Sequence, residues 1–488
     1  MDESLKQKTF SGLVWNFLET FALQGFGFVQ GIILARHLLP SDYGLIAMTS
    51  VFFAVSYTLM DAGFTSALIR KKERQEIDYS TVYVTNIVLS FVLSIALCLC
   101  ATWIADFYKE PVLRFIVYAN ALLMFLWSFV SVQTARLSIQ LEFKAKSLIN
   151  LAATFVPGIF SIIWACMGWG VWSLIFPNFI SIIIRFLLYW RYQRWLPKFN
   201  FSWSIYKEYF FFGSKLTLTN LLNTIYDNIY PLIIGKYYMT SKLGYYTKAQ
   251  NYASLSSFLL GGVIYRVTFP VLSKLQDDNE RLRNVYRRMI RVTAYVVFPV
   301  ATLLVVLARP FIIVLITEKW EPCIPYLQVL CFAAIWNPIH SLNLNLLLIK
   351  GRSDLFLRLE IIKKIIGVSV LLITIPMGLL VMCYGQLGAA ILFLVMNTYY
   401  TGKFINVGFF KQMRDLLPTI LYATSMGFLV WGVTLFISSE ILQLIVGPIL
   451  GIMSYVAISK MMRSMELFYL VDIFKQSVWK KYVSRGSS

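Results

Sequence analysis

The side chains with the greatest potential for chemistry are amide and ionisable groups set inside long apolar segments. Asn220, Asn223 and Asp227 follow one another at intervals of three and four residues, so on a helix they share one face. In an apolar surrounding such groups are costly unless they are paired or face a polar cavity. Hydrogen bonding between helices is the structural alternative for the two Asn residues.

Two acidic and three basic residues lie in other apolar segments. The carboxylates are Glu19 and Asp61, and the cations are Arg185, Lys248 and Arg266. Lys248 and Arg266 are separated by about five helical turns, so they point the same way from one helix. Together with the polar face above, these side chains are expected to line a polar cavity of mixed charge.

A structural role is the alternative for several of these residues. Arg185 and Arg266 lie near predicted helix ends, where a long cation reaches the lipid headgroups. Asp61 is about two turns from Arg70 and could pair with such a basic neighbour. Glu19 lies deeper in its segment, as Asp227 does, and there a functional role is favoured.

The apolar segments themselves predict an all-α membrane protein. Of 488 residues, 58% are hydrophobic and 14% charged, whereas a soluble protein carries about 25% charged residues. Apolar runs of ~20 residues recur along the chain, and in lipid such runs form helices because every backbone group must be satisfied internally. About fourteen membrane helices are expected, at 10–37, 43–69, 80–106, 112–135, 146–167, 171–191, 208–236, 242–271, 288–308, 323–349, 355–378, 384–408, 417–437 and 440–461.

The distribution of Lys and Arg predicts the orientation. When residues at the helix ends are counted with the loops they join, one alternating set of loops and both termini holds 33 Lys and Arg residues, and the opposite loops hold 7. Positive residues stay on the cytoplasmic side, so both termini are expected in the cytoplasm. The net charge of +20 is therefore mostly topological and does not indicate a nucleic-acid partner.

Several kinds of chemistry are not expected. The six Cys have no paired spacing and the two His are far apart, so no metal site is predicted. The chain has no phosphate-binding Gly-rich loop with Lys, and its outward loops are too short to carry paired catalytic carboxylates. An enzymatic function is therefore not expected.

The two halves of the chain look related. At an offset of 200 residues, 33–36 (ILAR) aligns with 233–236 (IIGK), and 41–44 (SDYG) aligns with 241–244 (SKLG). Six helices separate the copies, so they would be parallel repeats that form two six-helix lobes around a central cavity, followed by a terminal helix pair. The predicted division is 1–198 for the first lobe, 199–410 for the second, and 411–488 for the last two helices and the tail.

Four motifs carry a resemblance to a known family. They are ILAR at 33–36 with PSDYG at 40–44, DAGF at 61–64 with SALIRKK at 66–72, TFPVLSKLQDDNERLR at 268–283, and KGRSDLFLRLEIIKK at 350–364. In these motifs the chain resembles the Wzx-type polysaccharide and O-antigen flippases of the multidrug/oligosaccharidyl-lipid/polysaccharide (MOP) superfamily, most closely the colanic acid exporter (WzxC-like) branch.

This resemblance implies a MATE/MOP-like fold and a transport function in lipopolysaccharide or exopolysaccharide biosynthesis. The expected substrate is a polyprenyl-diphosphate-linked oligosaccharide, carried from the cytoplasmic to the periplasmic leaflet of the bacterial inner membrane by alternating access. No cofactor is expected beyond a coupling ion, Na+ or H+. A polysaccharide polymerase and a chain-length regulator are the further candidate partners besides the lipid bilayer.

The resemblance also implies roles for the candidate residues. Arg185, Lys248 and Arg266 would hold the diphosphate, Asn220 and Asn223 would contact sugars, and Asp227, Glu19 and Asp61 would couple the ion. Related lipid II flippases use a carboxylate on their seventh helix near a sodium site, and Asp227 on the seventh predicted helix would match it. The predicted helix at 355–378 carries Glu360, Lys363 and Lys364 near its cytoplasmic end and has no carboxylate deep in the membrane. Either Na+ or H+ is therefore expected as the coupling ion.

Two other functions are weighed against transport of a lipid-linked sugar. A MATE-like antiporter of small molecules and drugs would share the architecture, but for cationic drugs it would favour an acidic or apolar cavity. A membrane-embedded polymerase or glycosyltransferase would need sizeable periplasmic loops with catalytic residues.

Overall fold

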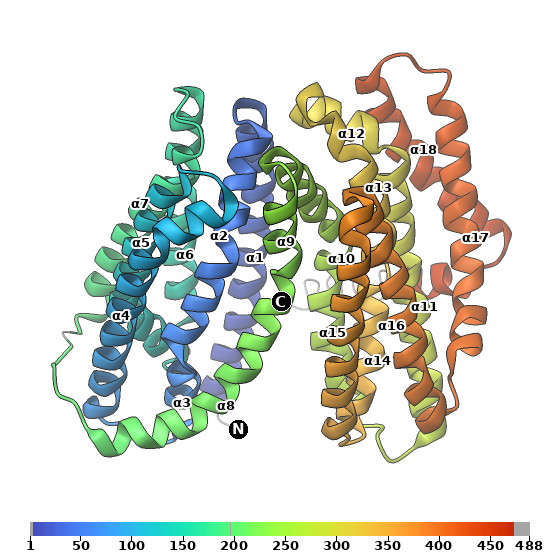
Figure 1. Cartoon of the computed structure of the whole chain (residues 1–488). Coiled ribbons are helices and arrows are strands. Elements are labelled where there is room, and N and C mark those ends of the chain that lie inside the picture. The colour runs from blue at the N-terminus through green and yellow to red at the C-terminus, as the bar shows by residue number, and fades with distance from the viewer. Residues whose placement is uncertain (1–2, 196, 473–488) are drawn as a thin grey trace, which may run out of the picture. The chain divides into compact units, whose positions relative to one another are not determined.

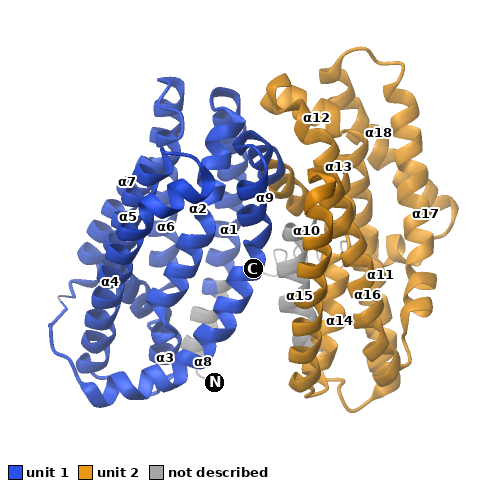
Figure 2. Cartoon of the chain, viewed as in Figure 1, with its two compact units in different colours: residues 1–247 blue, residues 248–488 orange. Residues whose placement is uncertain are grey.

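The computed structural model describes residues 3–195 and 197–472, with side chains placed outside 3–10, 13 and 256–271. Within these ranges the regular elements are all helices (Figure 1). Residues 1–247 form one compact unit and 248–488 form the second (Figure 2). We call these unit 1 and unit 2.

Unit 1 contains nine helices and the start of a tenth in its described part. They are α1 (Glu3–His37), α2 (Pro40–Asp61), α3 (Phe64–Arg70), α4 (Glu76–Tyr108), α5 (Leu113–Ile139), α6 (Phe143–Cys166), α7 (Trp172–Gln193), α8 (Trp203–Asp227), α9 (Ile229–Tyr237) and α10 (Thr240–Ser273), which continues into unit 2.

The described part of unit 2 continues with the remaining helices. They are α11 (Asn279–Val306), α12 (Ala308–Ile316), the 3-10 helix η1 (Glu318–Cys323), α13 (Ile324–Ala334), α14 (Asn337–Ile349), α15 (Ser353–Thr374), η2 (Ile375–Met377), α16 (Leu379–Ile405), α17 (Phe409–Thr434) and α18 (Glu440–Met461).

Each predicted membrane segment is helical, but three of them are interrupted. The segment 43–69 breaks at Ala62 and Gly63, which both adopt positive φ. The segment 208–236 breaks at Asn228, and Pro231 has no N–H to donate to the carbonyl group four residues earlier. The segment 323–349 breaks before Pro338, which lies in the first turn of α14.

Eleven helical segments in the described ranges are long and apolar enough to cross a membrane, so the all-α multi-pass architecture is confirmed. The other three predicted spans, α8–α9, α10 and α15, are helical as well. Two of them are more polar: α8 carries the Asn and Asp face, and α15 carries Glu360, Lys363 and Lys364.

The boundary between the two compact units, after residue 247, lies further along the chain than the predicted boundary between the repeats, after residue 198. α8 packs against α2, α3 and α4, and α9 packs against α2 and α4. These two helices therefore belong to unit 1, although the repeat alignment makes them the start of the second copy. The division at 198 and 410 stays a prediction about the repeat.

A close contact joins the two repeated motifs within unit 1. A Cβ atom added to Gly44 would lie 2.0 Å from the carbonyl oxygen of Thr240, and one added to Gly244 would lie 1.8 Å from that of Pro40. The two glycines occupy equivalent positions in SDYG and SKLG. The first turns of α2 and α10 thus meet in a reciprocal backbone contact that side chains larger than hydrogen would prevent.

Candidate functional site

A hydrogen-bond network in unit 1 joins two of the predicted site residues. Glu19 on α1 is half-buried, and its carboxylate accepts hydrogen bonds from Ser147 Oγ at 2.5 Å and Asn150 Nδ2 at 2.8 Å. Both donors lie on α6. The side-chain oxygen of Asn150 in turn accepts a hydrogen bond from Arg185 Nη1 on α7. One amide therefore connects an anion and a cation on three different helices.

The guanidinium group of Arg185 has unused donor capacity. It lies 5.4 Å from the ring centroid of Trp127, which supports one face of the cation. Its Nε is buried, and no described residue accepts a hydrogen bond from it. Since a guanidinium carries five N–H donors in one plane, this side chain can bind an anionic or polar oxygen group.

Two prolines hold α6 and α7 together around this network. Pro157 cannot donate to the carbonyl of Ala153, and that oxygen accepts from Ser181 Oγ on α7 at 2.6 Å. Pro177 likewise frees the carbonyl of Ser173, which accepts from Ser161 Oγ on α6 at 2.7 Å. These reciprocal bonds fix the register of the two helices and so the distance between Asn150 and Arg185.

Sequence reasoning predicted Glu19 and Arg185 but missed their partners. Ser147 and Asn150 are three residues apart on one face of α6, a spacing also common among polar residues that serve only helix packing. Their contact with α1 depends on the packing of α1 against α6, which a single helical wheel does not contain. The signal that could have found them was this second polar pair in an apolar helix.

The polar face predicted on α8 lies at the end of that helix. Asn220, Asn223 and Asp227 are exposed in the structure, and Asp227 is the last residue of α8. The contact with α2 is made instead by Thr224, whose hydroxyl lies 3.2 Å from that of Thr58, and by the amide of Asn228, which accepts from Ser50 Oγ at 3.2 Å. The roles proposed for the exposed face stay predictions.

The other candidates are dispersed. Asp61 accepts a hydrogen bond from Thr65, and no described Lys or Arg lies within 4.0 Å of its carboxylate. Lys248, in unit 2, is 6% exposed, and its Nζ lies 5.7 Å and 5.8 Å from the ring centroids of Tyr252 and Trp320. The side chain of Arg266 lies outside the described residues. Within unit 1 the structure thus unites Glu19 with Arg185, and the hydrogen bond of Asp61 is to its own neighbour Thr65.

Sequence comparison relates the chain to proteins of polysaccharide biosynthesis. A family profile described as "Polysaccharide biosynthesis protein" matches residues 33–325. The chain is 26% identical over 400 residues to the lipopolysaccharide biosynthesis protein WzxC of Escherichia coli K12, covering 82% of this chain and 80% of that protein. It is 24% identical over 435 residues to the teichuronic acid biosynthesis protein TuaB of Bacillus subtilis, covering 88% and 90%.

Solved structures match this chain at low sequence identity, so the comparison with them is evidence for the fold only. The lipid II flippase MurJ in an inward closed conformation matches with a TM-score of 0.71 and 15% identity, over 92% of this chain and 98% of that one. An inward-facing multidrug resistance MATE family transporter of the MOP superfamily matches with a TM-score of 0.61 and 15% identity, over 78% and 95%. The expected MATE/MOP-like fold is confirmed.

Proposed function

The chain belongs to the polysaccharide biosynthesis protein family of membrane proteins, and we propose that it flips a polyprenyl-diphosphate-linked oligosaccharide. The direction is from the cytoplasmic to the periplasmic leaflet of the bacterial inner membrane. Support comes from relatives named for lipopolysaccharide and teichuronic acid biosynthesis and from the fold shared with a lipid II flippase. The protein would act as a transporter and not as an enzyme.

The observation that carries the proposal is the position of Arg185. This cation lies in an apolar helix bundle, is held by Asn150 and Trp127, and keeps a buried donor without a described acceptor. A planar guanidinium forms paired hydrogen bonds to phosphate oxygens. We assign it to the diphosphate, with Asn220 and Asn223 as further polar contacts for the sugars.

Glu19 gives the site a means of responding to an ion. Its carboxylate accepts from two donors, one on each oxygen, so a proton or Na+ on it would remove its negative charge and weaken the hydrogen bonds from Ser147 and Asn150. Because Asn150 also accepts from Arg185, that weakening would change the support of the cation. An ion can shift the equilibrium between inward-open and outward-open conformations only if the two conformations bind that ion with different affinities. Na+ and H+ are the two proposed coupling ions, with Asp227 and Asp61 as further carboxylates.

The proposed orientation and partners follow from charge and from the product. The excess of Lys and Arg on alternate loops and at both termini favours cytoplasmic termini. A flipped repeat unit is the substrate for chain elongation in the periplasm. A polysaccharide polymerase and a chain-length regulator are therefore the protein partners we propose.

The test is to extract lipid-linked oligosaccharides from cells with and without the gene and to resolve them by mass. Deletion should make an unpolymerised polyprenyl-diphosphate repeat unit accumulate. Complementation with Arg185→Ala should leave it accumulated, whereas Arg191→Ala, an exposed cation on the same helix, should clear it. Unchanged intermediates together with a higher sensitivity to cationic drugs would contradict flipping and support the small-molecule antiporter.

A further inference from the structure

A basic pocket lies where α8 passes α3 at one end of unit 1. Its volume is 430 Å³. The side chains around it comprise three cations, one carboxylate and aromatic and small apolar groups: Arg70, Lys71, Lys215, Glu208, Tyr209, Phe211, Phe212 and Ala67. The pocket is therefore positive, and its wall is partly apolar.

Two of the three cations are not neutralised within the described part of the protein. Lys71 is paired with Asp78 at 2.6 Å. Arg70 and Lys215 have no described carboxylate within 4.0 Å. The Arg70 guanidinium lies 4.5 Å from the ring centroid of Phe212, and Lys215 Nζ lies 4.5 Å from that of Phe211. Aromatic rings thus position these two charges on the pocket without cancelling them.

The pocket is built on firmly packed elements. Tyr209 is 2% exposed, and its hydroxyl donates to Asp78 at 2.9 Å, which ties α8 to the start of α4. Gly63, with φ of +73°, lies so close to α8 that an added Cβ would be 2.7 Å from Gly213 Cα. The helix backbones that carry Arg70 and Lys215 are therefore held at a defined separation.

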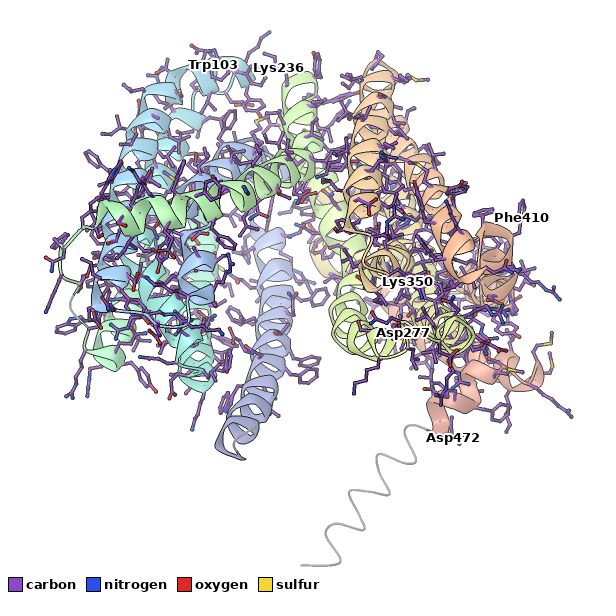
Figure 3. The ribbon with its side chains drawn as sticks, turned by 90° about the horizontal axis from the view of Figure 1, so that it is seen from below. Trp103, Lys236, Asp277, Lys350, Phe410 and Asp472 are labelled. Carbon is purple, nitrogen blue, oxygen red and sulfur yellow. The ribbon has the colours of Figure 1, made fainter. Side chains whose placement is uncertain are left out.

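Its position fits the headgroup layer of a membrane. α8 begins along the lower end of unit 1 and then rises toward α9 (Figure 1), and it crosses that end when seen from below (Figure 3). This region exposes large aromatic side chains, with Phe199 at 75%, Trp203 at 59% and Phe211 at 70%. Lys207 lies 5.6 Å from the Trp203 ring centroid. Aromatic and basic side chains together on an exposed surface are typical of the membrane interface.

We propose that this pocket binds the phosphate group of a lipid in the cytoplasmic leaflet. Arg70 and Lys215 would contact the phosphate oxygens, and Phe211 and Phe212 would contact the adjoining apolar part of the lipid. The phosphate comes from one of two sources, an anionic phospholipid or the diphosphate of a polyprenyl-linked sugar. Binding at this pocket requires no transport, so the inference stands or falls separately from the proposed function.

The test measures lipid binding to the purified full chain in phosphatidylcholine nanodiscs. Phosphatidylglycerol and undecaprenyl diphosphate are titrated separately. The variant Arg70→Gln/Lys215→Gln is compared with Lys144→Gln/Arg191→Gln, which removes the same charge from other exposed cations of unit 1. A cation at the bound anionic headgroup strengthens binding by about five-fold, whereas Lys144 and Arg191 lie outside the pocket and do not contact the phosphate. We therefore expect about 30-fold weaker binding for the first variant and less than about two-fold for the second.

The two lipid arms identify the source of the phosphate. Weakening for phosphatidylglycerol alone assigns the pocket to phospholipid, weakening for undecaprenyl diphosphate alone assigns it to the carrier lipid, and weakening for both assigns it to the phosphate group itself. Equal effects of the two double variants, or none, would overturn the proposal. The charge-preserving Arg70→Lys/Lys215→Arg should keep binding within about three-fold, and single Lys215→Gln repeats the test if the double variant does not fold.

Discussion

The reciprocal contact of Gly44 and Gly244 gives the sharpest test of the packing of unit 1. In a helix, Gly→Ala normally stabilises by about 1 kcal/mol. At Gly244 the new methyl carbon would lie 1.8 Å from the carbonyl oxygen of Pro40. Ordinary contact begins at 3.4 Å, so the two helix starts would have to separate. Overpacking of this kind costs about 1–3 kcal/mol, and more when backbone must move.

The expected net effect of Gly244→Ala is therefore a loss of stability of about 1–2 kcal/mol, opposite in sign to helix propensity. The assay is thermal or denaturant unfolding of the purified protein in a single detergent. Gly388→Ala on α16 is the matched control, because an added Cβ there meets nothing within 4 Å. Gly244→Ala as stable as Gly388→Ala would refute the close approach.

Three further sets of substitutions test named ion pairs and hydrogen bonds by the same unfolding assay. Glu19→Ala should lose about 2 kcal/mol, Glu19→Gln less, and the double mutant with Arg185→Ala should show coupling of about 0.5–1 kcal/mol; strict additivity would contradict the shared network. Asp78→Asn should cost about 3 kcal/mol because it removes the charge that pairs with Lys71 and sets a buried amide N–H against one of the donors that the carboxylate accepts from, Lys71 and Tyr209 on one oxygen and the Gln75 N–H on the other; a change below about 0.5 kcal/mol would contradict this. Arg287→Lys should cost about 1 kcal/mol or less, since it replaces two bonds of 2.6 Å to Asp415 on a partly exposed side chain; a stabilised variant would contradict the paired geometry.

Much of the fold could be predicted because the membrane imposes simple rules. Length and hydropathy located the helices, and the prolines and glycines marked where several break. Residues 309–322 lie between two of the predicted membrane segments, and there the structure forms most of α12 and η1. These elements are short, and Arg309 holds them by ion pairs to Glu321 at 2.6 Å and Glu440 at 3.0 Å, which local periodicity does not reveal.

The candidate site was predictable only in part, because helical wheels describe one helix at a time. They identified Glu19 and Arg185 as costly charges in apolar segments, but not Asn150 as the amide between them. They also placed Lys248 on a stripe that faces a cavity. That placement stays a prediction. In the structure Lys248 is buried and its Nζ lies 5.8 Å from the ring centroid of Trp320, which lies between two predicted membrane segments and which a helical wheel does not include.

Flipping of a polyprenyl-diphosphate-linked oligosaccharide by this protein can be measured directly after reconstitution into liposomes. Proteoliposomes would contain the purified chain and a labelled polyprenyl-diphosphate oligosaccharide, with an impermeant hydrolase added outside and a Na+ or H+ gradient imposed in turn. If the protein flips the lipid, more than the half of the labelled lipid that initially faces outward should be hydrolysed, and faster under one of the two gradients. Arg185→Ala should abolish this increase. If the native chain is folded and only the half of the lipid that initially faces outward is hydrolysed under both gradients, flipping by this protein is contradicted.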